Sequence, residues 1–138
     1  MVDRDVLREK CATVEASVRR LRLRTPATVE GLEGDVDAQE SVRLNLQVAI
    51  QACIDLAAHV VADEGYELAP EPAATFAVLA REGIIPAELS VRLASAAGLR
   101  NILVHRYGQL EMARIHDAAV AGIADLIEFC RVVRERFG

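Results

Sequence analysis

Residues 100–107, Arg-Asn-Ile-Leu-Val-His-Arg-Tyr, gather most of the side chains in this chain that could do chemistry. An arginine holds a phosphate through a planar fork of N–H donors. A histidine side chain has an unperturbed pKa of about 6.5, so it can accept and donate protons near neutral pH. These are the groups that a metal-free RNA-cleaving site needs, because one stabilises charge on the phosphate and the other moves a proton. The segment is therefore a candidate ribonuclease site.

The spacing of Arg100 and His105 limits how they can act together. On a continuous helix, residues five apart point about 140° away from each other, whereas Asn101 and His105, four apart, share a face. Asn101 is thus placed to hold the imidazole ring of His105. To bring Arg100 and His105 together, either the helix loosens near its end or another chain completes the site.

The elements that must position this segment are helices. Apolar residues recur at spacings of three and four along most of the chain, which is the pattern of amphipathic helices. The predicted helices cover residues 3–24, 37–63, 72–81, 86–105 and 111–136, with a loop at 25–36. We expect an all-α fold, an up-and-down bundle of four main helices plus one short helix, in a single domain of residues 1–138.

The second predicted helix combines dense apolar residues with one polar line. The line consists of Arg43, Gln47, Gln51, Asp55 and His59, each four residues from the next, so that neighbours touch along the helix surface. Two interpretations remain open. The line is either the solvent edge of an amphipathic helix, or Asp55 and Gln51 reach the motif across a bundle and orient its arginine or histidine.

The formal net charge of −5 argues against a general nucleic-acid binder, because phosphate binding usually requires a basic face. Any positive surface must therefore be local. Clusters occur at Arg19, Arg20, Arg22 and Arg24 and around the motif at Arg100, His105, Arg106, Arg114 and His116. The first cluster is also explained as a solvated helix end whose arginines complement the helix dipole.

The N-terminus and the apolar runs bear on location. Residues 1–5 lack the charged and then apolar design of a signal peptide, and no apolar run approaches the roughly 18 residues of a membrane span. We expect a cytoplasmic protein that does not contact a membrane.

The cysteines and the remaining histidines suggest no metal site. Cys11, Cys53 and Cys130 are odd in number and lack C-x-x-C spacing, so we interpret them as small core residues. His59 and His116 have no second ligand at metal-binding spacing, which favours structural roles. We expect neither metal nor cofactor.

The Arg-x4-His-x-Tyr pattern resembles the signature of the HEPN superfamily and, with its tyrosine, of the HepT branch. Residues 50–57 and 97–101 also look like the HepT pattern, in the same order. The resemblance implies helical protomers that pair, with two motifs facing each other across the interface in a composite cleft. It also implies that Arg100 and His105 are catalytic in RNA cleavage. A dimer would explain the excess apolar surface of the second predicted helix.

In the HepT branch the partner is an MntA-like nucleotidyltransferase antitoxin that attaches AMP to the tyrosine of the motif. The resemblance therefore implies that Tyr107 is AMPylated, in a homodimer or a larger assembly with the antitoxin. Tyr107 could instead simply pack at a helix end with its hydroxyl in water. An alternative function is a non-catalytic helical module that binds a nucleotide or a nucleotidyltransferase, and a third is a structural dimer.

Overall fold

The computed structural model describes residues 1–105 and 111–138, and within these ranges every regular element is helical. The elements are α1 (Arg4–Arg24), α2 (Val29–Glu33), α3 (Val36–Asp63), α4 (Pro72–Arg81), α5 (Ala87–His105), α6 (Met112–Asp117), the π-helix η2 (Ala118–Gly122) and α7 (Ile123–Phe137). The all-α prediction is confirmed, and the main helices begin and end within about two residues of the expected positions.

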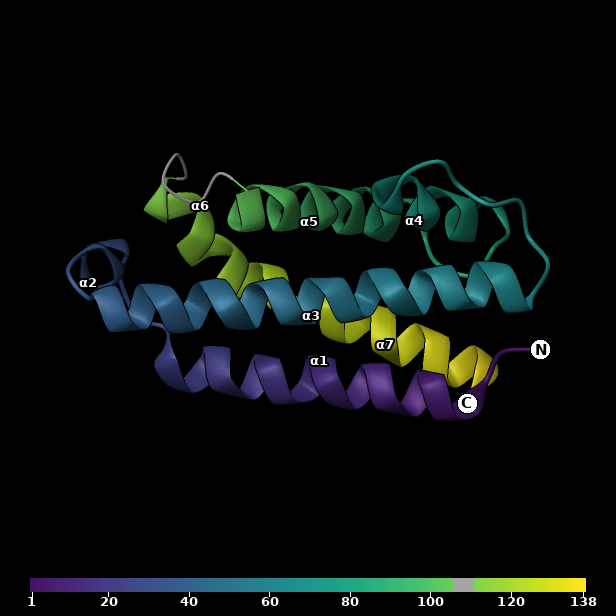
Figure 1. Ribbon diagram of the computed structural model, residues 1–138, viewed down its shortest axis with the longest axis horizontal. Helices are drawn as coiled ribbons and strands as arrows, with labels where there is room; N and C mark the ends of the chain where they lie inside the picture. The colour runs from purple at the N-terminus through teal and green to yellow at the C-terminus, as the bar shows by residue number, and fades with distance from the viewer. Residues whose placement is uncertain (106–110) are drawn as a thin grey trace.

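The long helix α3 runs through the centre of the bundle (Figure 1). It contacts α1, α4, α5 and α7, which together cover most of its surface. Both chain termini lie at one end of the bundle, whereas the C-terminal end of α5, α6 and α2 lie at the other (Figure 1). The candidate motif therefore sits at the end of the bundle remote from the termini.

Local side chains explain where the helices start and stop. The Asp3 carboxylate accepts hydrogen bonds from the backbone N–H groups of the first turn of α1, and Asp35 does the same at the start of α3. Pro72 opens α4, where its missing N–H costs nothing. Gly83, with a φ of 76°, follows α4 in the left-handed conformation that glycine adopts most easily.

The predicted loop at 25–36 was wrong in part, because it contains the short helix α2. The hydroxyl of Thr28 accepts a hydrogen bond from the N–H of Gly31, and the Leu32 side chain is buried in the core. The Gln39 side chain then donates to the carbonyl oxygens of Leu32 and Glu33. A five-residue helix is too short to show a periodic pattern, so sequence periodicity could not reveal it.

The last predicted helix, 111–136, is also not a single α-helix. It is a helical run from Met112 to Phe137 whose middle, Ala118–Gly122, is a π-helix. A π-turn is closed by hydrogen bonds between residues five apart. The buried residues Ile115, Ala119 and Ile123 follow one another here at spacings of four, which also occur in an α-helical pattern. The apolar pattern of the sequence therefore does not distinguish the π-helix from the α-helices on either side of it.

The apolar character of α3 exceeds the expectation from the sequence. Within Val36–Asp63, an 18-residue window reaches a mean hydropathy of 1.4, so this helix is long and apolar enough to cross a membrane by length and composition. The expectation that no apolar run approaches this length was wrong. Because 61% of that window is buried inside the bundle, core packing accounts for its composition.

The three cysteines, expected to be core residues, are all buried, and Cys130 lies beside both Cys11 and Cys53. The Cys11 thiol on α1 is hydrogen-bonded to Cys130 on α7, and Cys130 to Cys53 on α3. The Cys53 Sγ donates in turn to the Leu126 carbonyl oxygen, at 4.0 Å. The hydrogen bond to Cys130, together with burial, raises the pKa of Cys11. For Cys130 the hydrogen bond from Cys11 lowers the pKa, but the bond to Cys53 and burial outweigh it and raise the pKa overall.

These raised pKa values predict a loss of stability at alkaline pH. Above about pH 8.5 the thiols of the unfolded chain lose protons that the folded chain retains, so the free energy of unfolding falls as pH rises. Each thiol contributes up to about 1.4 kcal/mol per pH unit. Urea unfolding at a series of pH values measures this slope. A Cys11→Ala/Cys130→Ala variant is expected to be less stable but to have a shallower alkaline slope, and an unchanged slope would contradict the assignment.

Candidate active site

Arg100 lies on the side of α5 that faces the core. Ala97 and Leu103, each three residues away along the helix, are both buried, and Arg100 itself is half-buried. Its Nη1 donates to the side-chain oxygen of Asn101 at 3.3 Å, whereas its Nε is buried and has no hydrogen-bond partner among the described residues. Because a buried donor without a partner costs about 1–3 kcal/mol, such a group calls for a specific explanation, such as a ligand.

His105 is the last residue of α5 and is exposed, as is Asn101 one turn before it. The helix is regular α-helix up to His105, so it does not loosen in the way that one alternative required. The side chains of Arg100 and His105 therefore leave the helix about 140° apart, one toward the core and one toward solvent. Within one protomer, α5 brings His105 to the side of Asn101 but not to Arg100.

Two exposed helix faces carry small and apolar residues near the motif. On α5, the side that ends in His105 carries Val91, which is exposed, and Gly98, around whose added Cβ no atom lies within 4 Å. On α3, Leu44 is 53% exposed and Val48 is 36% exposed. The excess apolar surface expected for this helix is therefore present as an exposed patch.

Asp55 and Gln51 lie on the same face of α3 as Leu44 and Val48, at successive spacings of four, three and four residues. The Gln51 amide donates to Asp55 Oδ1 at 2.8 Å, and Asp55 Oδ2 lies 3.5 Å from the ammonium of Lys10 on α1. Their partners in this protomer are thus each other and Lys10, not the arginine or histidine of the motif.

The position of Asp55 along α3 also separates it from the motif residues of α5. Leu46 of α3 and Leu99 of α5 line the same cleft, which places Arg100 at about the level of Leu46. Asp55 lies nine residues farther along α3, or about 13 Å at the rise of an α-helix. A contact between Asp55 and the motif would have to come from a second protomer.

That cleft, of about 200 Å³, was not predicted from the sequence. It lies between α3, α5 and the run from α6 to α7, and Leu46, Leu99 and Leu126 form part of its wall. At its rim the Arg92 Nε donates to Asp125 Oδ1 at 2.9 Å, tying α5 to α7. Ala118 and Gly122 of the π-helix also line the cleft, and no periodic pattern in the sequence indicates a π-helix there.

The other histidines are placed as structural residues. His116 on α6 donates a ring N–H to the Pro26 carbonyl oxygen at 2.8 Å, which ties α6 to the segment after α1. This confirms the expected structural role. His59 is exposed near the end of α3. Across residues 1–105 and 111–138, no group of three or more His, Cys, Asp or Glu side chains is arranged to hold a metal ion. Arg106 and the predicted modification site Tyr107 lie outside the described residues.

Comparison with known protein families shows which family this chain belongs to. The family model described as HepT-like, Ribonuclease HepT-like, matches residues 14–133. The chain belongs to this family. Among its relatives is the mRNA nuclease HepT of Shewanella oneidensis, 29% identical over 130 residues, with 94% of this chain and 97% of the relative covered. A putative RNase of Archaeoglobus fulgidus is 30% identical over 114 residues, with 83% and 78% covered.

Solved structures of HepT-like proteins share the fold. A toxin–antitoxin crystal structure with AMP-PNP has a TM-score of 0.89 at 28% identity, covering 95% of this chain and 98% of that chain. The tri-AMPylated Shewanella oneidensis HEPN toxin, solved in complex with the MNT antitoxin, has a TM-score of 0.88 at 29% identity, with the same coverage. The HEPN-like helical bundle expected for this HepT-like chain is thereby confirmed.

Because His116 makes a structural hydrogen bond, its replacement should lower stability without the loss of RNA cleavage expected for His105. Replacing His116 with Ala removes the hydrogen bond to Pro26, so the free energy of unfolding should fall by about 0.5–1.5 kcal/mol. Chemical denaturation measures this loss. RNA cleavage at a temperature where the variant is folded should remain within about twofold of the wild type, since a purely structural bond adds nothing to transition-state stabilisation. A large loss of activity in a folded His116→Ala variant would place His116 in the site instead.

Proposed function

We propose that this chain is a metal-independent endoribonuclease, the toxin of a toxin–antitoxin pair, with Arg100 and His105 as its catalytic residues. One observation carries the proposal: in a HepT-like chain, the Arg-x4-His motif lies at the end of α5, with an exposed His105 and a buried Arg100 Nε that has no partner among the described residues. These are a donor suited to a phosphate oxygen and a proton carrier open to substrate.

The chemistry is a transfer within the RNA backbone. One His105 takes the proton from a ribose 2′-hydroxyl, whose oxygen attacks the neighbouring phosphorus. The bond from phosphorus to the 5′-oxygen breaks, and a second His105 gives that oxygen its proton. Arg100 stabilises the charge that grows on the non-bridging oxygens. The products are a 2′,3′-cyclic phosphate and a 5′-hydroxyl, and the two histidines end in exchanged protonation states.

This scheme needs two protomers. Because α5 remains helical to His105, one chain points Arg100 and His105 in different directions. A homodimer that buries Leu44, Val48 and the α5 face around Gly98 would give the exposed apolar patch a partner. Asn101 then orients the imidazole, and Asp55 and Gln51, on the same α3 face as the patch, reach the motif of the partner protomer. The two Arg100 and two His105 side chains share one cleft.

We further propose that Tyr107 is the site of neutralisation by an MntA-like nucleotidyltransferase antitoxin. Relatives of similar fold are solved as toxin–antitoxin complexes, and one is a tri-AMPylated HEPN toxin bound to an MNT antitoxin. Tyr107 follows His105 by two residues. Adding AMP there places bulk and negative charge beside the cleft, where it blocks RNA and repels phosphate.

Substitution of the two motif residues tests the proposal. Removing the acid–base group in His105→Ala should slow RNA cleavage about 10²–10⁴-fold, and removing the phosphate-stabilising group in Arg100→Ala should slow it about 10²–10³-fold. Purified protein is assayed on RNA with EDTA present, and growth is followed in cells expressing each variant. Arg8→Ala, an exposed arginine on α1, serves as the control. A folded wild type that binds a nucleotidyltransferase but cleaves no RNA would favour the non-catalytic module instead.

Mixing the two variants distinguishes a composite site from one within a single protomer. A dimer of one Arg100→Ala chain and one His105→Ala chain retains one arginine and one histidine, on different protomers, and lacks the second histidine of the scheme. Co-expression should therefore restore partial cleavage, above that of either variant alone, if the residues act across the interface. The control is a dimer of one wild-type chain and one Arg100→Ala/His105→Ala chain, which keeps the same two groups on one protomer. Higher cleavage by this control than by the mixed dimer would place the functional pair within one chain.

Replacing Tyr107 with Phe removes the hydroxyl that accepts AMP while keeping the ring. The variant should cleave RNA at near the wild-type rate but remain toxic when the nucleotidyltransferase is co-expressed with it. Intact-mass measurement after co-expression should show added AMP on the wild type and none on the variant. Tyr66→Phe, the other tyrosine of the chain, is the matched control and should be modified and neutralised like the wild type. Full neutralisation of the Tyr107→Phe variant would overturn this assignment.

A further inference from the structure

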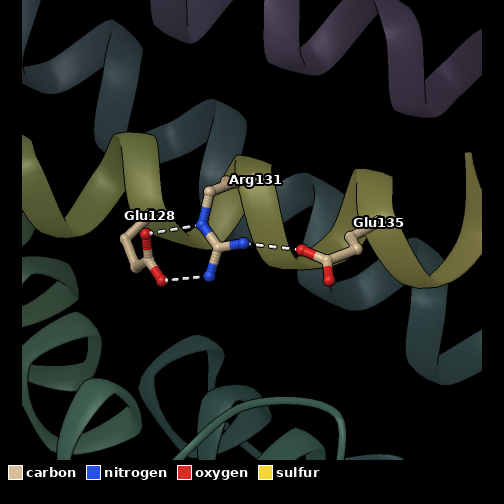
Figure 2. Close-up of polar contacts among 3 residues, drawn as sticks. All are labelled: Glu128, Arg131 and Glu135. Atoms are coloured by element: carbon tan, nitrogen blue, oxygen red, sulfur yellow. Dashed lines mark hydrogen bonds and ion pairs between the residues drawn. The ribbon is translucent and has the colours of Figure 1, made fainter.

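The arginines of this chain fall into two groups by their partners. Several are held by carboxylates: Arg92 by Asp125, Arg134 by Glu15 and Arg131 by two glutamates. Figure 2 shows Arg131 between Glu128 and Glu135 on α7, with hydrogen bonds of 2.6–2.9 Å. These cations are already neutralised, so they offer little to an external anion.

The last turns of α1 carry arginines of the second kind. We define the α1 cluster as Arg19, Arg20, Arg22 and Arg24. All four side chains are exposed, and none makes a hydrogen bond or an ion pair with a described residue. Four positive charges within six residues form a concentrated basic surface on a chain whose formal net charge is −5. Asp35 and Asp37 line the same hollow as Arg20 and Arg24 without forming an ion pair with them.

Folding stability does not account for the cluster. The helix dipole favours cations in the last turn of a helix, and only Arg22 and Arg24 lie there. Arg19 and Arg20 stand outside that turn. The pairs Arg20 and Arg24, four apart, and Arg19 and Arg22, three apart, place like charges next to each other on the helix surface, which is unfavourable for the helix. An anionic partner that binds the folded protein would offset this repulsion.

The position of the cluster points to the kind of anion. The C-terminal end of α1 lies at the same end of the bundle as the end of α5 (Figure 1). The helix α3 contacts both α1 and α5, so two interaxial distances of 8–10 Å place the axes of α1 and α5 at most about 16–20 Å apart. A strand of RNA a few nucleotides long spans this distance. Guanidinium groups suit its phosphates because their planar forks match phosphate oxygens.

We propose that the α1 cluster is a second phosphate-binding surface, which holds the RNA strand beside the cleavage site. The inference rests on the proposed ribonuclease function and deepens it. Arg100 and His105 act on the scissile bond, whereas the α1 cluster binds phosphates that do not react. The contacts go to the backbone, so they raise affinity for any sequence and select for length.

The test uses full-length chains carrying His105→Ala, so that RNA is bound but not cut. In the cluster variant, all four arginines of the α1 cluster become Gln. In the matched control, Arg4, Arg8, Arg81 and Arg136, four exposed arginines elsewhere, become Gln, so both variants lose the same charge. Binding of a fluorescein-labelled single-stranded RNA is followed by anisotropy at several salt concentrations. Since each lost phosphate contact reduces the slope of log K against log salt by about 0.7, the cluster variant should lose about 1.4–2.8 for two to four contacts.

A second readout uses chains with an intact motif. The cluster variant should show a raised KM and an unchanged kcat on long RNA, and wild-type kinetics on an RNA dinucleotide, which is too short to reach α1. Equal weakening of RNA binding in the cluster variant and the control would reduce the effect to net charge and overturn the inference. If the cluster variant binds RNA as the wild type does but no longer co-purifies with the nucleotidyltransferase, the inference is overturned in favour of a protein-docking surface. Either result would leave the proposed ribonuclease function supported, provided that the wild type cleaves RNA and His105→Ala does not. A wild type that cleaves no RNA would contradict both the proposed function and this inference.

Discussion

The bundle depends on the burial of α3. Its 28 residues contact α1, α4, α5 and α7, and side chains such as Leu46, Leu56 and Val60 are almost fully shielded from solvent. With few aromatic residues available, the core is made of Leu, Ile, Val and Ala packed around this axis, with the Phe76 and Phe129 rings in a T-shaped contact, 5.4 Å between centroids. At Leu44 and Val48 none of the other described helices covers α3, and these side chains form the exposed apolar patch. It lies on the part of α3 nearest the motif, so the same helix that organises one protomer offers apolar surface for a second.

The phase of a continuous helix then governs the site. α5 must bury one side against α3 and α4, and Arg100 falls on that side, where its Nε is desolvated and has no partner in residues 1–105 and 111–138. His105 falls on the opposite, solvent-facing side because it comes five residues later. A regular helix cannot satisfy both packing and a one-chain active site with this spacing. The proposed symmetric pair of chains would satisfy both, since the exposed histidine of each chain could meet the other chain.

Sequence reasoning reached the features that follow a helical period and missed those that depend on tertiary contacts. The ends of α1, α3, α4 and α5 were predicted because local residues set them, such as Pro72 at the start of α4 and Gly83 after its end. α2 was missed because it is held by Thr28, Leu32 and Gln39 rather than by a repeating pattern. The convergence of three cysteines far apart in the sequence could not be seen before the helices were packed. The same is true of Lys10 as the partner of Asp55. Spacing on α3 put Asp55 on an exposed edge, but only the packing of α1 shows what it pairs with in one protomer.

The distribution of charge completes the argument from the acidic composition. A formal charge of −5 would repel RNA if it were spread evenly over the surface. Part of the positive charge is also neutralised within the protein, because carboxylates form ion pairs with Arg92, Arg131 and Arg134. Exposed ion pairs of this kind add little stability but cancel the field of both partners. Arg19, Arg20, Arg22 and Arg24 have no such partners among the described residues and lie at the end of the bundle that carries the motif. The α1 cluster is thus a local concentration of positive charge at that end, so an approaching polyanion is attracted there more strongly than an evenly spread net charge of −5 would allow.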